Sequence, residues 1–202
     1  MGPIYLVRHG ETVWNRVGRH QGHGDSPLSL RGIGQVRAVA ALLGGLLDGG
    51  RRAGLRVQCS PLFRARQTCA ILCDSLGLDY EAVAFDDRLK ERAYGHWEGL
   101  THGQIMAAHG DEWAARAADP WHHAARGGET NFDVAARVRA WLDDQHGAGP
   151  VLAVAHGSMG KVLRGVYAGL DAAAIAALDE PHTTVYRLEG GGVTAFDAAE
   201  EP

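Results

Sequence analysis

The feature that most constrains this chain is the stretch of residues 4 to 12, where an apolar run stops at Arg8, His9 and Gly10. Residues 4 to 7 combine β-branched, aromatic and aliphatic side chains and predict a strand buried on both faces of a parallel sheet. Arg8 and His9 then lie at the carboxyl edge of that sheet, where open α/β folds bind ligands. An imidazole there can act as a nucleophile, and a guanidinium matches the oxygens of a phosphate. The stretch therefore indicates phosphoryl chemistry on a histidine, the alternative being a solvated basic pair.

A second apolar strand, predicted over residues 151 to 155, ends in the same way, in His156, Gly157 and Ser158. A helix is expected to follow through about Ala168, with Ser158 as its N-cap. Two buried strands that each deliver a histidine to the carboxyl edge of one sheet are much less expected by chance than a single one. We therefore expect His9 and His156 to share one site.

The spacing of apolar residues elsewhere predicts alternating helices and strands, which is typical of an α/β fold. One helix is expected from Ser29 to the Gly49-Gly50 pair, and a second from Ser60 to about Leu76. A third is expected from Glu129 to the glycines at 147 and 149. The expected strands are residues 55 to 59 and 80 to 85, and a hairpin of residues 184 to 188 and 193 to 196. A chain of 202 residues is long enough for one sizeable core. We expect one domain over residues 1 to 198 and a loose tail over 199 to 202.

Two further stretches are candidates for substrate contact. Residues 11 to 30 are rich in Gly, Asn, Asp, Ser and Pro and predict a long irregular loop, a kind that is usually functional. Its side chains suited to an anion are Asn15, Arg16, Arg19, His20, Gln21 and His23. Residues 100 to 128 predict a helical insertion, interpreted as a cap over the sheet edge that decides the substrate. Its aromatic and imidazole groups are Trp113, Trp121, His122 and His123.

Arg64 and Glu91 are candidates on physical grounds. Arg64 stands in the first turn of the helix predicted after a Ser60 cap, where the helix dipole disfavours a cation. A bound anion would remove that conflict, whereas the alternative is an ordinary exposed arginine. Glu91 precedes a glycine-containing loop anchored by Tyr94 and Trp97, which could hold either Glu91 or Glu98 in a fixed place. The alternative for Glu91 is a surface ion pair with its basic neighbours.

Composition excludes several classes of protein. A net charge of −4 argues against a general nucleic-acid binder. No apolar run has the length of a membrane span, and the first strand begins too early for a signal peptide, so we expect a cytoplasmic protein without a membrane partner. The three cysteines predict reduced core residues, and the spacing of cysteines and histidines matches no common metal motif. No metal or cofactor is therefore expected, and no feature indicates an oligomeric state.

The ordered set of motifs resembles the histidine phosphatase superfamily, also called the phosphoglycerate mutase-like family. The resemblance spans residues 4 to about 160 and rests on stretches in the family's order. These are Leu6 to Thr12, Gln21-Gly22, Asp25-x-Pro27-Leu28-Ser29, Ser60-Pro61-Leu62 with Arg64-Ala65-x-Gln67-Thr68, Glu91 with Gly95-x-Trp97-Glu98-Gly99, Gly128-Glu129-Thr130, and Ala155-His156-Gly157. It implies a three-layer α/β/α sandwich around a mixed, mostly parallel sheet.

The resemblance also implies a role for each matching residue. His9 would be the nucleophile that becomes phosphorylated, and Glu91 the proton donor. The phosphate and substrate pocket would be formed by Arg8, Asn15, Gln21, Gly22, Arg64, His156 and Gly157. The chain departs from the family at His182, where asparagine often follows a proline, so no contribution to the pocket is assigned to that residue.

Phosphoryl transfer needs an in-line nucleophile and a positive cradle for the equatorial oxygens. We expect His9 to be neutral, with one ring nitrogen free to attack and the proton of the other held by a backbone carbonyl. Glu91 must instead carry a proton for the leaving oxygen, which a nearby phosphate dianion would favour. The arginines supply the charge that a metal would otherwise provide.

Three functions remain open at this point. Attack of water on the phosphohistidine gives a phosphomonoester hydrolase for a small metabolite, which most of the motifs favour. A retained phosphoglycerate gives a cofactor-dependent phosphoglycerate mutase, which the run from Glu91 to Gly95 favours. The third is a catalytically inactive phosphoester-binding regulatory module, which the complete set of candidate residues disfavours.

Overall fold

The computed structural model describes residues 1–47, 50 and 52–199. In this part of the chain, a six-stranded sheet has the order β3-β2-β4-β1-β5-β6. Four strands run parallel: β1 (Ile4–Arg8), β2 (Arg56–Cys59), β3 (Ala84–Phe85) and β4 (Val151–Ala155). The antiparallel hairpin of β5 (Thr184–Glu189) and β6 (Gly192–Asp197) completes the sheet beside β1. The predicted mixed, mostly parallel sheet is confirmed.

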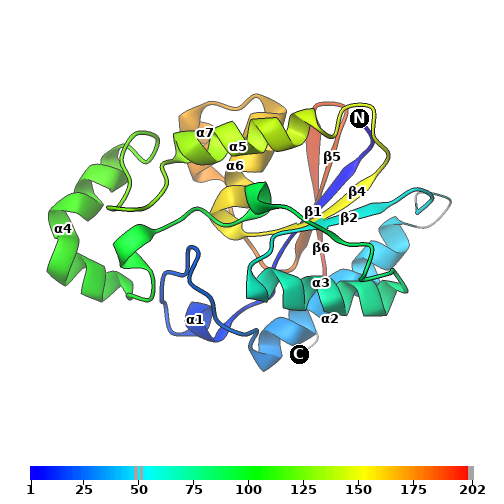
Figure 1. Ribbon diagram of the computed structural model, residues 1–202, viewed down its shortest axis with the longest axis horizontal. Helices are drawn as coiled ribbons and strands as arrows, with labels where there is room; N and C mark the ends of the chain where they lie inside the picture. The colour runs from blue at the N-terminus through cyan, green and yellow to red at the C-terminus, as the bar shows by residue number, and fades with distance from the viewer. Residues whose placement is uncertain (48–49, 51, 200–202) are drawn as a thin grey trace.

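Helices cover both faces of the sheet (Figure 1). On one face lie α2 (Leu30–Leu46) and α3 (Phe63–Leu76), and on the other α5 (Asn131–Asp143) and α6 (Gly157–Ala168), with α7 (Ala172–Ala177) against α6. Successive side chains of β4 alternate between the layers: Leu152 and Val154 join the core under α2 and α3, whereas Ala153 joins the core under α5 and α6. The three-layer α/β/α sandwich follows from this two-sided burial.

Two helices lie outside these layers. The short α1 (Val13–Arg16) interrupts the loop predicted over residues 11 to 30. Periodicity could not reveal it because none of its residues is buried, and a capping box between Thr12 and Asn15 stabilises it instead. The longer α4 (His102–Ala118) stands away from the sheet at one end of the molecule (Figure 1). No described helix combines the length and apolar character needed to cross a bilayer.

Several predicted boundaries were wrong. The third strand begins at Ala84 rather than at residue 80, because residues 80 to 83 close a turn in which Val83 N–H donates to the Tyr80 carbonyl. The helix after Thr130 ends at Asp143, before either predicted glycine stop. Of the Gly49-Gly50 pair, Gly49 lies outside the described residues, as do residues 200 to 202 of the predicted tail, and α2 ends at Leu46.

Both predicted serine caps were also wrong. The N-cap of α3 is Leu62, and that of α6 is His156, and neither caps its helix with a side-chain hydrogen bond. Ser60 pairs its hydroxyl with the His156 ring at 2.7 Å and also accepts from Leu62 N–H at 3.3 Å, before the helix begins. Ser158 lies in the first turn of α6, where its N–H donates to Glu91. Carboxylates from other segments cap these two helices, which the local sequence does not reveal.

The contact between α2 and the segment after β1 gives a stability prediction. A Cβ on Gly32 would lie 2.0 Å from the backbone oxygen of Glu11, whereas a Cβ on Gly34, two residues along the same helix, would meet no atom within 4 Å. We expect Gly32→Ala to lower the free energy of unfolding by about 2 kcal/mol through overpacking against backbone. Gly34→Ala should raise it by up to about 1 kcal/mol through helix propensity. Urea unfolding of both variants measures the difference, and equal midpoints would contradict the packing described.

Candidate active site

The pairing of β1 with β4 brings the two predicted histidines together. Arg8 lies opposite Ala155 in the parallel register, and His9 N–H donates to the Ala155 carbonyl at 3.0 Å. His9 and His156 therefore leave the sheet side by side at its carboxyl edge, with ring centroids 5.2 Å apart. The two histidines predicted at this edge thus lie next to each other.

His9 is held as a neutral imidazole whose Nε2 carries the lone pair. Its Nδ1 lies 2.8 Å from the Gly10 carbonyl oxygen, which can only accept, so Nδ1 carries the proton and Nε2 the lone pair. Burial lowers the pKa of His9 well below its usual value, and the charges of Arg64 and Arg8 lower it further. The structure thus has the predicted hydrogen bond to a backbone carbonyl, and the lowered pKa favours the neutral imidazole.

Arg64 aims its guanidinium at the same point from the first turn of α3. The side chain is 1% exposed, and Nε donates to Nε2 of His9 at 3.3 Å. Its two terminal nitrogens donate to the backbone carbonyls of Gly22 at 2.7 Å and Gly24 at 2.9 Å, which fixes the plane of the guanidinium. A phosphate seated at His9 Nε2 would therefore meet a preoriented cation.

The conflict between Arg64 and the dipole of α3 has a structural solution. The Asp25 carboxylate accepts from the backbone N–H groups of Phe63 and Arg64 and forms an ion pair with the Arg64 side chain at 3.0 Å. A carboxylate at a helix N-terminus satisfies both the free N–H groups and the dipole. The anion inferred from the position of Arg64 is thus supplied at least in part by the protein itself.

Glu91 reaches the site from the segment after the 3-10 turn η1 (Asp87–Leu89). Its Oε1 accepts from the N–H groups of Arg92 and Met159 at 2.8 Å each, and its Oε2 accepts from Ser158 N–H at 3.1 Å. The carboxylate therefore sits at the N-terminus of α6, 7% exposed. Arg137 holds the same segment by donating to the carbonyls of Arg88, Lys90 and Glu91.

Glu98, the other acid that the sequence left open, has a different position. Its two oxygens accept from the N–H groups of His23, Gly24 and Tyr94 and so brace one loop against another. Gly22, at φ +55°, passes so close that a Cβ would lie 2.2 Å from Glu98 Oε1. Glu98 does not line the pocket that holds His9, whereas Glu91 does.

His156 lies behind His9 and is 2% exposed. Its Nε2 pairs with the Ser60 hydroxyl, while its Nδ1 is buried and has no hydrogen-bond partner among the described residues. Burial lowers the pKa of His156 well below its usual value, with Arg64 as the next cause. The Nε of Arg8 is likewise buried without a partner in the described chain. Buried polar atoms without a partner are costly, and an anion that accepted from them would remove that cost.

A polar cavity of about 120 Å³ connects most of these groups. Its lining is Arg8, His9, Asn15, Arg19, His20, Gln21, Gly22, Arg64, Glu91, Tyr94, Ser158 and Glu180. Seven of the nine predicted site residues therefore meet in one cavity. His156 and Gly157 line a smaller cavity beside it, which shares Arg8 and Glu180 with the first.

The comparisons with known proteins agree with this geometry. A family model described as the histidine phosphatase superfamily (branch 1) matches residues 4–195. The chain belongs to the histidine phosphatase superfamily. It is 38% identical, over 77% of its length and 70% of the relative's, to a glucosyl-3-phosphoglycerate phosphatase of Mycobacterium tuberculosis. It is also 32% identical to a probable phosphoglycerate mutase of an Enterobacter species, over 98% and 86% of the two chains.

Solved structures give the same result. The structure of a mycobacterial glucosyl-3-phosphoglycerate phosphatase with VO3 superposes with a TM-score of 0.79 at 32% identity and covers 100% of both chains. A putative α-ribazole-5′-phosphate phosphatase of Escherichia coli superposes with a TM-score of 0.81 at 25% identity, over 98% and 95% of the chains. The protein is thus an enzyme of the histidine phosphatase kind, related to phosphatases of small phosphorylated metabolites.

In this histidine phosphatase, the side-chain amides of Asn15 and Gln21 already use part of their hydrogen-bonding capacity within the loop. Asn15 Oδ1 accepts from the N–H and hydroxyl of Thr12, which turns its amide nitrogen away from that contact. Gln21 Nε2 donates to the Thr12 hydroxyl at 2.8 Å, so one of its two donor hydrogens is already used. Both amides line the cavity, but each is also part of a network that fixes the loop.

The sequence assigned no role to His182 or Glu180, which both lie near the carboxyl edge of the sheet. His182 donates from Nδ1 to the His9 carbonyl at 2.7 Å, and its ring centroid lies 5.6 Å from that of His9. Burial lowers the pKa of His182 to about 4, so it too is neutral near pH 7. Glu180 covers Gly157, where a Cβ would lie 1.9 Å from its Oε2, and its carbonyl accepts from Arg8.

The other lining residues missed in the sequence are Tyr94, Ser158 and Glu180. Tyr94 was interpreted only as an anchor and Ser158 as a cap, and Glu180 belongs to no motif. Position alone could have indicated Ser158, because it follows His156 at the carboxyl edge. Nothing local to Glu180 indicates that its segment returns to Arg8.

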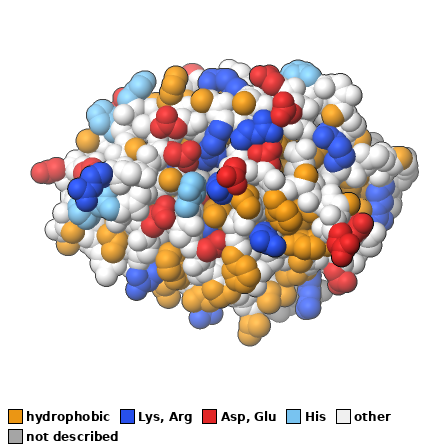
Figure 2. All heavy atoms as spheres, in the orientation of Figure 1, with side chains coloured by type: hydrophobic (Ala, Val, Ile, Leu, Met, Phe, Trp, Pro, Cys, Tyr) orange, Lys and Arg blue, Asp and Glu red, His pale blue; other side chains and the backbone are white. Residues whose placement is uncertain are grey.

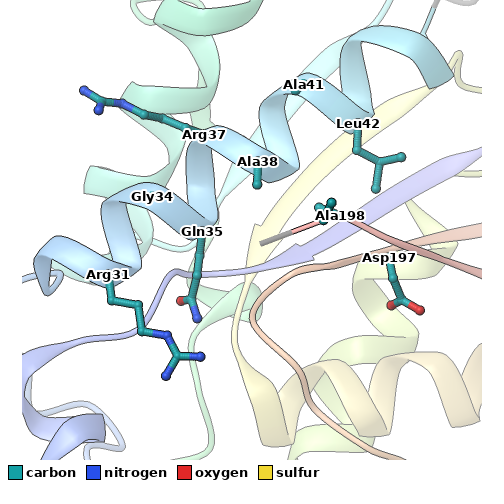
Figure 3. Close-up of a pocket in the computed structure, with 10 residues that line it drawn as sticks. Arg31, Gly34, Gln35, Arg37, Ala38, Ala41, Leu42, Asp197 and Ala198 are labelled. Atoms are coloured by element: carbon teal, nitrogen blue, oxygen red, sulfur yellow. The ribbon is translucent and has the colours of Figure 1, made fainter. Parts of the chain in front are cut away.

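A second, larger cavity of about 720 Å³ lies between α2 and the end of β6 (Figure 3). Arg31, Gln35 and Arg37 contribute its polar groups on α2, and Leu42 and Ala198 lie at its apolar end. Its lining includes no histidine, cysteine or serine that could act as a nucleophile. Volume therefore does not identify the reactive site in this protein, whereas the chemistry of the lining does.

Proposed function

We propose that this protein hydrolyses small phosphomonoesters through a phosphohistidine formed on His9, without a metal in the phosphate pocket. One observation carries the proposal. The Nε2 lone pair of His9 accepts from the Arg64 guanidinium at 3.3 Å beside a polar cavity, while the Gly10 carbonyl holds the Nδ1 proton. A nucleophile and its cationic cradle are thus already oriented, which is the main requirement of phosphoryl transfer.

In the first step, His9 Nε2 forms a bond to phosphorus as the ester P–O bond breaks. Arg8, Arg64 and the free nitrogen of His156 would stabilise the equatorial oxygens. Glu91 would give its proton to the departing oxygen, so the alcohol leaves neutral. Oε2 is suited to this transfer because it accepts one backbone hydrogen bond, whereas Oε1 accepts two.

In the second step, water attacks the phosphohistidine. Glu91, now a carboxylate, would accept the proton of this water and return to its starting state. The N–P bond then breaks, and His9 Nε2 regains its lone pair. The same carboxylate thus acts as acid and then as base, and the arginines balance the phosphate charge in both steps.

Incubation with p-nitrophenyl phosphate and with 3-phosphoglycerate tests this function. Release of inorganic phosphate is the expected result. Conversion of 3-phosphoglycerate to 2-phosphoglycerate would instead identify a mutase. Phosphate binding without either reaction would indicate a regulatory module.

The mutase remains the second candidate. The run from Glu91 to Gly95 and the relative named as a probable phosphoglycerate mutase both favour it. The difference between the two functions lies in whether phosphoglycerate stays bound while the phosphohistidine persists.

The role of Glu91 can be tested with Glu91→Gln, which keeps the size of the side chain and removes the proton. We expect a larger loss of turnover on alkyl phosphates than on p-nitrophenyl phosphate, because phenolate leaves without being protonated. Steady-state rates on a series of leaving groups measure this, with Glu98→Gln as the matched variant. An equal loss on every ester would remove Glu91 from the role of general acid.

Two arginines, Arg92 and Arg116, lie near His20 and Tyr94 of the pocket wall, which bears on the substrate class. Arg92 donates to the Tyr94 hydroxyl at 2.8 Å, and Tyr94 lines the pocket. Burial lowers the pKa of Arg116 to about 10, and the charge of nearby Arg92 adds to this effect. A second anionic group on the substrate, such as a carboxylate, would stabilise both guanidiniums. We therefore propose phosphomonoesters that carry a carboxylate, as in the substrate name of the mycobacterial relative.

Arg116→Ala tests this preference. We expect the KM for a phosphorylated carboxylic acid such as 3-phosphoglycerate to rise about 10-fold or more, the size of one lost charged hydrogen bond. The KM for p-nitrophenyl phosphate, which lacks the carboxylate, should stay within about twofold of the parent because the phosphate contacts are unchanged. The exposed Arg139→Ala variant is the control for net charge. A parallel rise on both substrates would contradict the proposal.

We further propose that residues 1–198 act as one catalytic domain, with residues 100–128 as the substrate cap. Cytoplasmic location is supported by three buried free thiols, Cys59, Cys69 and Cys73, which suit a reducing compartment.

A further inference from the structure

A second cluster of reactive side chains lies outside the phosphate pocket. His96 from the 3-10 turn η2 (Gly95–Trp97) meets His109 and Glu112 from α4, and one ligand atom of each lies within 4.8 Å of the others. Figure 2 shows histidine side chains at the end of the molecule that α4 and the segment after it occupy. We propose that His96, His109 and Glu112 bind one Zn²⁺ ion that fastens α4 to the body of the protein.

The hydrogen bonds of His96 leave a donor–acceptor conflict that a cation resolves. Its Nδ1 lies 3.0 Å from the Arg126 carbonyl oxygen and must donate to it. In the neutral ring, Nε2 then presents a lone pair to Glu112 Oε2, which is only 3.0 Å away. Two lone pairs at this distance repel unless a second proton or a metal ion lies between them. Two ligands of a tetrahedral zinc, each bonded at about 2.0 Å, lie about 3.3 Å apart, close to this separation.

A single residue orients both ligands. While the Arg126 carbonyl accepts from His96 Nδ1, the Arg126 N–H donates to Glu112 Oε1 at 2.8 Å. The other oxygen of Glu112 and the other nitrogen of His96 are thereby directed at each other. An outer-shell hydrogen bond of this kind, from a ligating imidazole to a backbone carbonyl, is typical of protein metal sites.

The third ligand stands where α4 leaves its helical path. The backbone at His109 has φ −142° and ψ 32°, and the ring lies edge-on to His96 with centroids 4.5 Å apart. Glu112, three residues later, brings a carboxylate oxygen within 4.8 Å of a ring nitrogen of His109. Two imidazoles and one carboxylate, with water as a fourth ligand, form a donor set that zinc prefers.

The position of this site indicates its effect. The His96 ring packs on Trp97, Trp97 packs on Trp113 of α4 at 5.3 Å, and Trp113 packs on His20 of the pocket wall at 5.7 Å. Fastening α4 to His96 would therefore hold this aromatic stack and the cap side of the pocket in place. None of the three ligands lines the cavity of His9, so the ion takes no part in phosphoryl transfer.

Zinc binding to the full chain tests the proposal. Protein freed of metal with a chelator is titrated with ZnCl₂ at pH 7.5, and bound zinc is measured by calorimetry and by elemental analysis after dialysis. We expect one Zn²⁺ per chain and a higher Tm with zinc. Loss of an outer-shell hydrogen bond typically weakens metal binding by about 10- to 100-fold. His109→Gln and Glu112→Gln remove a ligand and should each weaken zinc binding by more than that. They should also abolish the rise in Tm.

Two control variants exclude zinc bound elsewhere. His122→Gln removes an exposed cap histidine outside the cluster, and His9→Gln removes the imidazole of the phosphate pocket; both should bind zinc like the parent. Circular dichroism of each variant without zinc checks that the fold is intact. A parent that binds no stoichiometric zinc, or that binds it no more tightly than His109→Gln does, would overturn the proposal.

Discussion

His9→Ala is expected to abolish phosphate release, with a loss of at least about 10⁴-fold in kcat on p-nitrophenyl phosphate, comparable to the loss of other enzyme nucleophiles. The reason is that His9 is the cavity imidazole whose Nε2 faces the Arg64 guanidinium. His156 is occupied by Ser60 at Nε2, and His182 is directed at the His9 carbonyl. Removal of His9 therefore leaves the phosphate cradle without an attacking atom.

The measurement is a continuous assay with purified variants at matched concentration. His146→Ala, at an exposed position remote from the pocket, controls for the loss of an imidazole. Inorganic phosphate binding by the His9→Ala variant checks that the cradle persists. A residual rate within about 10²-fold of the parent would mean that another group is the nucleophile.

Arg64→Ala should give the next largest effect, a loss of about 10² to 10³ in kcat, as for other preorganised donors at a developing charge. The guanidinium is fixed by the carbonyls of Gly22 and Gly24 and reaches His9 through Nε. No water molecule could replace such a donor without first being ordered. Arg64→Lys should recover only part of the rate, since a point charge lacks the planar fork.

Arg66→Ala is the matched control, because this exposed arginine lies on the same helix two residues away. Arg64 also holds the loop of residues 22 to 24, so a thermal unfolding curve must accompany the kinetics. A folded Arg64→Ala variant with near-parental turnover would exclude Arg64 from the phosphate cradle.

The fold could be predicted where the apolar pattern within a single helix or strand is enough to identify it. The runs of β1 and β4 are continuous and apolar, and α2 and α3 show regular stripes, so their type and order follow from periodicity. The failures occur where an element depends on remote partners. The start of α3 is set by Asp25, and β3 is limited to the two residues that pair with β2.

The candidate site was predictable for a related reason. His9 and His156 follow apolar strands, and parallel strands bring their carboxyl ends to one edge whatever the connections between them. Glu180 was missed because its segment returns to Arg8 only in three dimensions. His96, His109 and Glu112 were missed because their spacing matches no metal motif, and the bend of α4 at His109 is not visible in the sequence.

Detection of the phosphohistidine is the most direct test that His9 is the nucleophile. The enzyme is mixed with p-nitrophenyl phosphate, quenched in base within a turnover, digested, and examined by mass spectrometry for a base-stable, acid-labile phosphoryl group. We expect one such group, on the peptide that carries His9, and it should disappear when the substrate is exhausted. A phosphoryl group on any other residue, or turnover with no phosphorylated peptide under conditions that preserve phosphohistidine, would contradict this role of His9.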